Sequence, residues 1–161
     1  MKTRSEIWMR APAATIYRLG AEVERWPELL PHYRWVTVLE RDGCRKLVEM
    51  AAHRDGIPVR WQAVQELLPD VPRITFTHVR GITRGMAVEW AFCEQGEGTL
   101  VRIDHHLALG WPLVGNWVAD HLIGPQFVAI IAGKTLRRIK DIAEGITESA
   151  GEGGEVRRAR P

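Results

Sequence analysis

The sequence predicts an α+β fold in which a curved antiparallel sheet of about seven strands is covered by one long C-terminal helix. Over the first two thirds of the chain, hydrophobic and polar residues alternate between turn signals, which is typical of strands. Near the end, hydrophobic residues recur every three or four positions, as in an amphipathic helix. With 161 residues, of which 45% are hydrophobic, the chain can bury one sizeable core. We therefore expect a single domain over residues 1–146 and a disordered tail, rich in Gly, Glu and Arg, over residues 147–161.

The N-terminal part of the chain predicts one strand and two short helices. Alternating residues favour a strand over Thr3–Met9. Pro12 fits a helix start, because proline lacks a backbone N–H and the first turn of a helix leaves this group without a partner in any case. We expect the short helices over Pro12–Leu19 and Glu22–Leu30, between the first and second strands.

The middle of the chain predicts six further strands, joined mainly by tight turns. Asp42-Gly43 and Asp55-Gly56 are strong hairpin signals, since glycine accepts the positive φ that such turns require. Successive strands joined by hairpins form an antiparallel meander. The predicted ranges are Tyr33–Arg41, Cys44–Arg54, Ile57–Leu68, Arg73–Arg80, Met86–Glu94 and Thr99–Leu109.

The C-terminal segment predicts a long helix with one apolar stripe. Pro125 fits its first position, and Gly145 is expected to end it. A shorter helix is expected before it, over Leu113–Ile123. Because one helix is a narrow cover for seven strands, we expect a cavity for an apolar ligand between helix and sheet. The stripe comprises Val128, Ile131, Ala132, Thr135, Leu136, Ile139, Ile142 and Ala143.

Alternation along the strands predicts which side chains face this cavity. Its expected polar groups are Gln65, His78 and His105, each on the apolar face of its strand, whereas His106 should point outward. The alternative is that the bulky apolar side chains fill the core and leave no open cavity. The apolar residues expected to line it are Trp61, Met86, Val88, Trp90 and Ile103 from the sheet and Val128 and Ile131 from the helix.

Several motifs point to a known family. The segment Trp26-Pro27-Glu28-Leu29-Leu30-Pro31-His32-Tyr33 resembles the polyketide cyclase/dehydrase branch of the START-like (SRPBCC, helix-grip) superfamily, which also contains coenzyme Q-binding proteins. Ala11-Pro12, the stretch from Gly81 to Trp90, and Arg137-Arg138-Ile139-Lys140 agree with that branch in order and spacing. The resemblance covers about Glu6 to Glu144 and implies a helix-grip fold, in which the curved sheet wraps round the C-terminal helix.

The resemblance implies a hydrophobic small-molecule ligand. The first hypothesis it suggests is aromatase/cyclase activity, the aldol cyclisation and dehydration of a poly-β-ketone chain, which needs a dry pocket and proton-transfer groups. By motif, Trp26 would line the mouth, Tyr33 would direct its phenol at the ligand, and Trp61 would form a wall. Members with demonstrated cyclase roles carry Ser and Arg where this chain has Ala63 and Gln65. This departure favours the alternative hypothesis, a non-catalytic carrier of a quinone or lipid.

Tyr33, His78 and His105 are the candidate catalytic residues, because a phenol can donate a proton and imidazole ordinarily titrates near neutral pH. Each has a purely structural alternative: a tyrosine at a pocket rim with its hydroxyl in water, or a buried histidine bonded to a backbone carbonyl. We expect no cofactor and no metal site. His105 and His106 are adjacent on one strand and point to opposite faces, so they cannot easily bind one ion.

Charge and cysteine content bear on partners and location. The net charge is +2, from 22 basic and 20 acidic residues. Arg157, Arg158 and Arg160 lack the interleaved aromatic residues of a base-stacking surface, so we expect no nucleic acid partner. A regulatory or interaction domain that uses this basic tail is the third hypothesis. We predict no transmembrane segment and no secretory signal, and we expect a cytoplasmic monomer or homodimer with Cys44 and Cys93 reduced.

Overall fold

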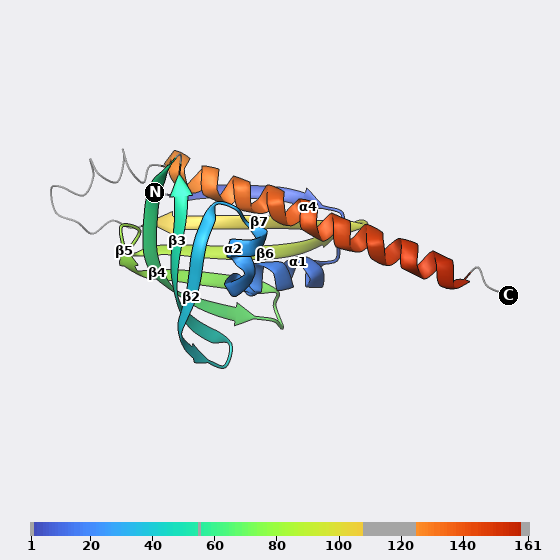
Figure 1. Cartoon of the computed structure of the whole chain (residues 1–161), viewed down its shortest axis with the longest axis horizontal. Helices are drawn as coiled ribbons and strands as arrows, with labels where there is room; N and C mark the ends of the chain where they lie inside the picture. Colours follow the sequence, from blue (N-terminus) through green and yellow to red (C-terminus); the bar gives the residue numbers. More distant parts are fainter. Residues whose placement is uncertain (1, 55, 108–124, 159–161) are drawn as a thin grey trace.

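The structure, a computed structural model, describes residues 2–54, 56–107 and 125–158 (Figure 1). These residues include seven strands, with short helices between the first two, so the predicted α+β architecture is confirmed. The observed strand bounds agree with the predicted ranges to within a few residues. In chain order the elements are β1 (Lys2–Met9), α1 (Ala13–Ala21), η1 (Val23–Arg25), α2 (Trp26–Leu29), β2 (Tyr33–Asp42), β3 (Arg45–Arg54), β4 (Ile57–Leu68), β5 (Arg73–Gly81), β6 (Met86–Gln95), β7 (Gly98–Leu107) and α4 (Pro125–Arg158).

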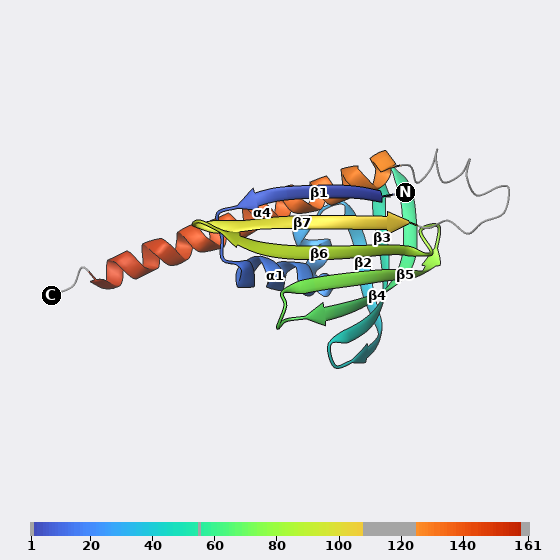
Figure 2. The same ribbon diagram turned by 180° about the vertical axis from the view of Figure 1, so that it is seen from behind.

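All seven strands form one antiparallel sheet in the order β1-β7-β6-β5-β4-β3-β2. Figures 1 and 2 show that β2 and β3 run across the direction of β5, β6, β7 and β1 and that β4 bends from the first direction to the second, so the sheet curves strongly. The pairing of β4 with β5 shifts register after Gln62: Trp61 lies opposite Gly81, whereas Ala63 lies opposite His78. Such a bulge increases the local bend of a sheet, and here it lies beside two aromatic rings of the interior.

Helix α4 covers the concave side of the sheet with the apolar stripe predicted from the sequence. Val128, Leu136, Ile139 and Ala143 are almost fully buried. Polar contacts fix the helix at both flanks. The Lys140 ammonium donates to the carbonyl of Trp8 at 2.9 Å, and the Arg138 Nε donates to the carbonyl of Leu29 at 3.1 Å. The helix therefore connects β1 on one side to α2 on the other.

The predicted end of this helix at Gly145 is wrong, since α4 continues to Arg158. Glycine inside a helix costs only about 1 kcal/mol relative to alanine. The hydroxyls of Thr147 and Ser149 also donate to carbonyls four residues earlier, each at 2.9 Å. Figure 1 shows the last turns beyond the sheet, where helicity rests on the local sequence rather than on packing. The domain boundary at residue 146, with a disordered tail after it, stays a prediction. The helix predicted over Leu113–Ile123 lies outside the described residues.

Candidate functional site

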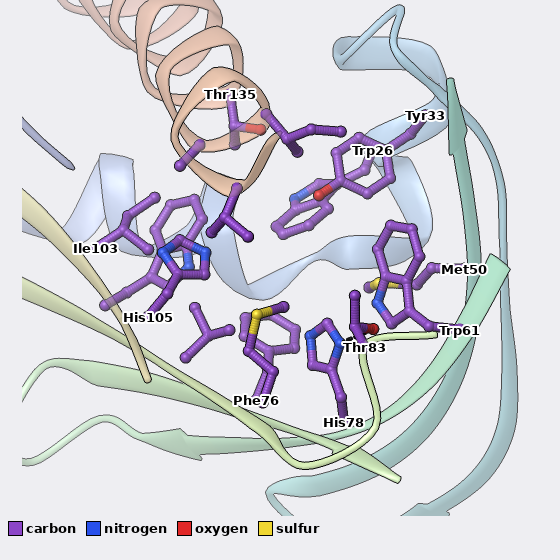
Figure 3. Close-up of a pocket in the computed structure, with 16 residues that line it drawn as sticks. Trp26, Tyr33, Met50, Trp61, Phe76, His78, Thr83, Ile103, His105 and Thr135 are labelled. Carbon is purple, nitrogen blue, oxygen red and sulfur yellow. Dashed lines mark hydrogen bonds between the residues drawn. The ribbon is translucent and has the colours of Figure 1, made fainter. Parts of the chain in front are cut away.

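A pocket lies between α4 and the concave face of the sheet (Figure 3). Strands β2 to β7, the helix α2 and the turn before β6 all contribute side chains to it. The cavity predicted between helix and sheet is therefore present. The described residues that line it are Trp26, Tyr33, Met50, Trp61, Phe76, His78, Thr83, Met86, Val88, Trp90, Ile103, His105, Val128, Ile131, Ala132 and Thr135.

The cavity is small in this conformation, with a volume of about 70 Å³. Sites for drug-sized molecules enclose roughly 300–1,000 Å³, and benzene needs a cavity of roughly 150 Å³. A ligand with fused rings therefore requires side chains to move. Met50 and Met86 are suited to this, because the unbranched methionine side chain repacks at low energetic cost.

Stacked aromatic rings form the walls of the pocket. Trp26 stacks on Trp90 with ring centroids 5.9 Å apart, and Tyr33 meets Trp26 edge-on at 4.9 Å. Trp61 lies parallel to His78, at 5.8 Å with an interplanar angle of 4°. The Trp26 indole N–H donates to the carbonyl of Leu19 at 3.0 Å, which fixes the ring and leaves its face to the pocket. The resulting lining favours a flat, apolar molecule.

Tyr33 is the first residue of β2, and its buried side chain points into the pocket, as Figure 3 shows. Burial raises the pKa of its phenol, and a side-chain hydrogen bond with Thr135 opposes that increase. The phenol is therefore uncharged at neutral pH and can donate a hydrogen bond. Thr135, on α4, is 2% exposed and also contacts His32, whose Nε2 lies 2.9 Å from the threonine hydroxyl.

Two histidines reach the pocket from the sheet. His78 is buried on β5, and its Nδ1 lies 2.6 Å from the hydroxyl of Thr83. Burial lowers the pKa of His78 to about 3, with a further contribution from the charge of His105. Burial also lowers the pKa of His105 to about 4, although the nearby Asp104 opposes the shift. At neutral pH both imidazoles are therefore uncharged, whereas an imidazole of ordinary pKa is partly protonated.

His105 has an unsatisfied polar atom. Its Nδ1 is buried and has no hydrogen-bond partner among the described residues. His106, the next residue, is exposed, so the predicted alternation along β7 is confirmed. A buried ring nitrogen without a partner is costly in an empty protein, and a ligand with a hydroxyl or carbonyl group could satisfy it.

Gln65 was expected to face the pocket but does not line it. It is fully buried on the predicted face of β4, yet its amide nitrogen donates to the carbonyl of Ala21 at 3.1 Å. Ala21 is the last residue of α1, so Gln65 supports the end of that helix. The other predicted residues all line the pocket: Trp26, Tyr33, Trp61, His78, Met86, Val88, Trp90, Ile103, His105, Val128 and Ile131.

Sequence reasoning missed five lining residues. Met50 and Phe76 lie on the buried faces of their strands, so alternation could have identified them. Ala132 and Thr135 belong to the apolar stripe of α4, but periodicity alone does not tell which members of a stripe face a ligand, and only Val128 and Ile131 were predicted to do so. Thr83 lies in the turn between β5 and β6, and no periodic pattern predicts where a turn residue points.

Other features bear on cofactors and partners. Among the described residues, no group of three or more His, Cys, Asp or Glu side chains could hold a metal ion. Cys44 and Cys93 are exposed and free. None of the described helices combines the length and the apolar character needed to cross a membrane. The expected absence of a cofactor and of a metal stays a prediction.

Comparison with known sequences identifies a family. Residues 9–121 match the model of the family described as polyketide cyclase/dehydrase and lipid transport. A provisionally named polyketide cyclase from Streptomyces halstedii is 30% identical over 103 residues, which are 62% of this chain and 94% of that protein. The bifunctional cyclase/dehydratase of the actinorhodin polyketide synthase from Streptomyces coelicolor is 33% identical over 101 residues, or 62% of this chain, but the match covers only 32% of that protein.

Solved structures agree with this assignment at the level of the fold. An aromatase/cyclase from Streptomyces sp. R1128 superposes with a TM-score of 0.78 at 17% identity, over 94% of this chain and 98% of the other. A START superfamily protein from Mycobacterium smegmatis gives a TM-score of 0.65 at 17% identity, over 92% and 98% of the two chains. The helix-grip architecture predicted from the motifs is thus confirmed, and the chain belongs to the family described as polyketide cyclase/dehydrase and lipid transport.

Proposed function

We propose that the pocket binds a flat, mainly apolar molecule that carries hydroxyl or carbonyl groups, and that the protein acts as a polyketide cyclase on a poly-β-ketone chain. The observation that carries this proposal is the combination of stacked aromatic walls with three neutral polar groups, on Tyr33, His78 and His105. Membership of the polyketide cyclase/dehydrase family supports the same substrate class.

The chemistry of ring closure assigns a task to each group. An aldol cyclisation removes a proton from a carbon between two carbonyls, forms a carbon–carbon bond to a third carbonyl, and protonates the oxygen of that carbonyl. His105, whose Nδ1 is unprotonated in one tautomer, would accept the carbon-bound proton, and Tyr33 would protonate the oxygen. His78 would bind a substrate oxygen through Nε2, because its Nδ1 is occupied by Thr83. Loss of water then follows: the proton on His105 leaves with the hydroxyl group, Tyr33 regains its proton from the carbon between the two carbonyls, and enolisation of the ring ketones makes the ring aromatic.

A second candidate function is a non-catalytic carrier of a quinone or lipid. The observation in its favour is that no described lining residue is charged. The pocket therefore has no cationic side chain that could stabilise an enolate. Ala63 and Gln65 stand where related cyclases carry Ser and Arg, and Gln65 lies outside the pocket. In this case Tyr33 and the two histidines would orient the ligand only.

Several further properties are part of the proposal. The partner is a hydrophobic small molecule rather than a nucleic acid, in keeping with the nearly balanced net charge of +2. We propose a cytoplasmic location, a monomeric or homodimeric state, and a single domain over residues 1–146 with a tail after it. Size measurements in solution and limited proteolysis of the tail would test these points.

Binding is tested by titration of the purified protein with naphthol and with a hydroxyanthraquinone, followed by tryptophan fluorescence. Ile131 lines the pocket, whereas its neighbour Ile130 is 37% exposed on the same helix. We expect Ile131→Phe to weaken binding by about tenfold or more, ~1.4 kcal/mol, because it fills the cavity, and Ile130→Phe to leave it unchanged. Equal effects of the two substitutions, or no quenching in the native protein, would contradict a ligand site in this pocket.

Catalysis is tested with a linear poly-β-ketone thioester, by mass spectrometry for loss of water. Tyr33→Phe removes only the hydroxyl, so we expect it to lower turnover by about a hundredfold or more while naphthol binding persists. A native protein that binds naphthol but releases no water from the thioester would instead be a carrier. Unchanged turnover in the Tyr33→Phe variant would show that the Tyr33 hydroxyl takes no part in the reaction.

A further inference from the structure

The turn between β5 and β6 is closed by backbone hydrogen bonds. The amide of Gly85 donates to the carbonyl of His78 at 2.9 Å, and the amide of Met86 donates to the carbonyl of Thr83 at 3.0 Å. Thr83 itself is only 2% exposed and lines the pocket. The turn that carries the Thr83 hydroxyl is thus bonded directly to the backbone of His78.

The imidazole of His78 is held by two neighbours. Its Nδ1 lies 2.6 Å from the Oγ1 of Thr83, and both side chains are buried. The Trp61 ring stacks on the imidazole, with centroids 5.8 Å apart and an interplanar angle of 4°. Figure 3 shows His78 directed into the pocket from the sheet, with Thr83 and Trp61 beside it. The other ring nitrogen, Nε2, has no hydrogen-bond partner among the described residues and is left for a ligand.

The single hydroxyl proton of Thr83 decides which nitrogen of His78 is protonated. Burial lowers the pKa of His78 to about 3, so at neutral pH the ring is uncharged and carries one proton. If this proton were on Nδ1, it would point at Thr83, and the hydroxyl proton would need a different acceptor. Among the described residues, the Thr83 hydroxyl has no other hydrogen-bond partner. Since a buried donor without a partner is costly, the favoured arrangement has Thr83 donating to Nδ1 and the ring proton on Nε2.

We propose that Thr83 is a positioning residue that fixes His78 as the Nε2–H tautomer, so that the pocket presents a fixed hydrogen-bond donor to a carbonyl oxygen of the ligand. A carbonyl oxygen only accepts, so this pairing leaves no ligand group unsatisfied. A hydroxyl group in the same place would need an acceptor for its own proton. The preference for a carbonyl rests on the proposed function, whereas the tautomer rests only on the contacts of His78 and Thr83.

The second histidine of the pocket differs in this respect. The Nδ1 of His105 is buried without a partner among the described residues, so no described contact selects its tautomer. His78 is therefore a fixed donor, whereas His105 is free to exchange its proton, as the base in the proposed ring closure must. A fixed donor stabilises the negative charge that develops on a carbonyl oxygen when a neighbouring carbon loses its proton.

NMR tests the tautomer without any ligand. In long-range ¹H–¹⁵N correlation spectra of the imidazoles, protonated and unprotonated ring nitrogens resonate far apart. The chain has six histidines, and the signals of His78 are those that disappear in His78→Leu. At neutral pH we expect the Nε2–H pattern for His78 in the native protein. An Nδ1–H pattern in the native protein would overturn the proposal.

Two substitutions of Thr83 test whether this residue sets the tautomer. Thr83→Val keeps the shape of the side chain but removes the hydroxyl, so we expect the two ¹⁵N shifts of His78 to move toward each other, as in an average over both tautomers. Thr83→Ser is the matched control, because it retains the hydroxyl and should keep the native pattern. Native shifts in Thr83→Val would overturn the role of Thr83.

The preference for a carbonyl is tested with 1-tetralone and tetralin, which share a two-ring skeleton and differ in one carbonyl oxygen. Calorimetric titration gives the ratio of the two affinities, in which packing effects common to both ligands cancel. We expect this ratio to fall about fivefold in His78→Leu, the factor typical of one net hydrogen bond. It should fall about twofold in Thr83→Val, because only part of the molecules then present the donor, and stay unchanged in Thr83→Ser.

The outcomes separate this proposal from the proposed function. An unchanged ratio in His78→Leu, with both ligands still bound, would overturn the carbonyl preference and leave apolar binding in the pocket standing. Failure of both ligands to bind the native protein would overturn the proposed function and the carbonyl preference together, whereas the tautomer is decided by the NMR spectra alone.

Discussion

Gln65 and His105 show how neighbours decide the role of a buried polar side chain. Both lie on the apolar faces of their strands, as alternation predicts. Gln65 has a nearby carbonyl, that of Ala21, which is also approached by the ammonium of Lys46 at 3.5 Å. Lys46 is itself paired with Glu24 at 2.9 Å. These contacts make Gln65 part of a polar support for α1, although its Oε1, like the Nδ1 of His105, has no described partner. The side chain of His105, by contrast, lines the pocket.

We predict that Gln65→Met lowers stability without changing ligand affinity. The substitution keeps the shape of the side chain but removes the hydrogen bond to Ala21, so the free energy of unfolding should fall by about 1 kcal/mol. Urea denaturation measures the first effect and a naphthol titration the second. Weaker naphthol binding at unchanged stability would place Gln65 in the pocket after all.

The sequence predicts the face on which a residue lies more reliably than the atom it contacts. Period-two alternation placed His78 inward because the pleat of a strand is regular. The same regularity says nothing of Thr83, a turn residue that binds the Nδ1 of His78, or of Thr135, whose partner His32 comes from a distant part of the chain. The polar connections of the site therefore required the three-dimensional structure.

At the scale of elements, the end of β5 shapes the wall of the pocket. Gly81 has a φ of +94° and lies opposite Trp61. A Cβ at this position would lie 2.6 Å from the carbonyl oxygen of Arg60 and 2.9 Å from the Cα of Trp61. The absence of a side chain thus allows the backbone of β5 to approach the strand that carries Trp61.

We predict that Gly81→Ala destabilises the protein by about 2 kcal/mol or more, since the left-handed conformation and the close contacts both oppose a side chain. Gly96→Ala is the control, because Gly96 has a φ of +61° but no atom within 4 Å of an added Cβ. It should cost only about 1 kcal/mol. Denaturant unfolding compares the two, and equal losses would mean that the contact with β4 is unimportant.

The predicted ends of strands agree with the structure where the turn requires a glycine for steric reasons. Gly43 and Gly56 have positive φ angles at the hairpins predicted from Asp-Gly pairs. Gly145 has no such constraint, and nothing lies within 4 Å of its added Cβ. A glycine is therefore a strong signal in a hairpin and a weak one inside a helix, which is why the predicted end of α4 was wrong.

At the scale of the whole molecule, neutral histidines in the core link stability to pH. The pKa values of His78 and His105 are lowered to about 3 and about 4, from an ordinary value of 6.5. Between these values and 6.5 the unfolded chain binds more protons than the folded one, so the free energy of unfolding rises with pH in that window. The stability that these two histidines contribute is fully present above about pH 6.5, and it is lost as the pH falls toward their pKa values in the folded protein.

We predict that acidification from about pH 7 to about pH 4.5 lowers the free energy of unfolding by ~2 kcal/mol for each of the two histidines. His105→Gln should remove one such contribution, whereas His106→Gln, at the exposed neighbouring position, should retain the pH dependence of the native protein. Urea denaturation at a series of pH values measures the slope. If the free energy of unfolding depends on pH equally in the two variants, His105 does not make the predicted contribution.

The central claim is that a flat apolar ligand enters the space between α4 and the sheet. Methyl NMR spectra recorded during the naphthol titration test it most directly, because they report binding residue by residue. We predict shifts at the pocket residues Met50, Met86 and Ile131, and none at Ile130 or Val79, which are exposed. Unchanged pocket methyls at saturating naphthol, or shifts confined to Ile130 and Val79, would contradict the account.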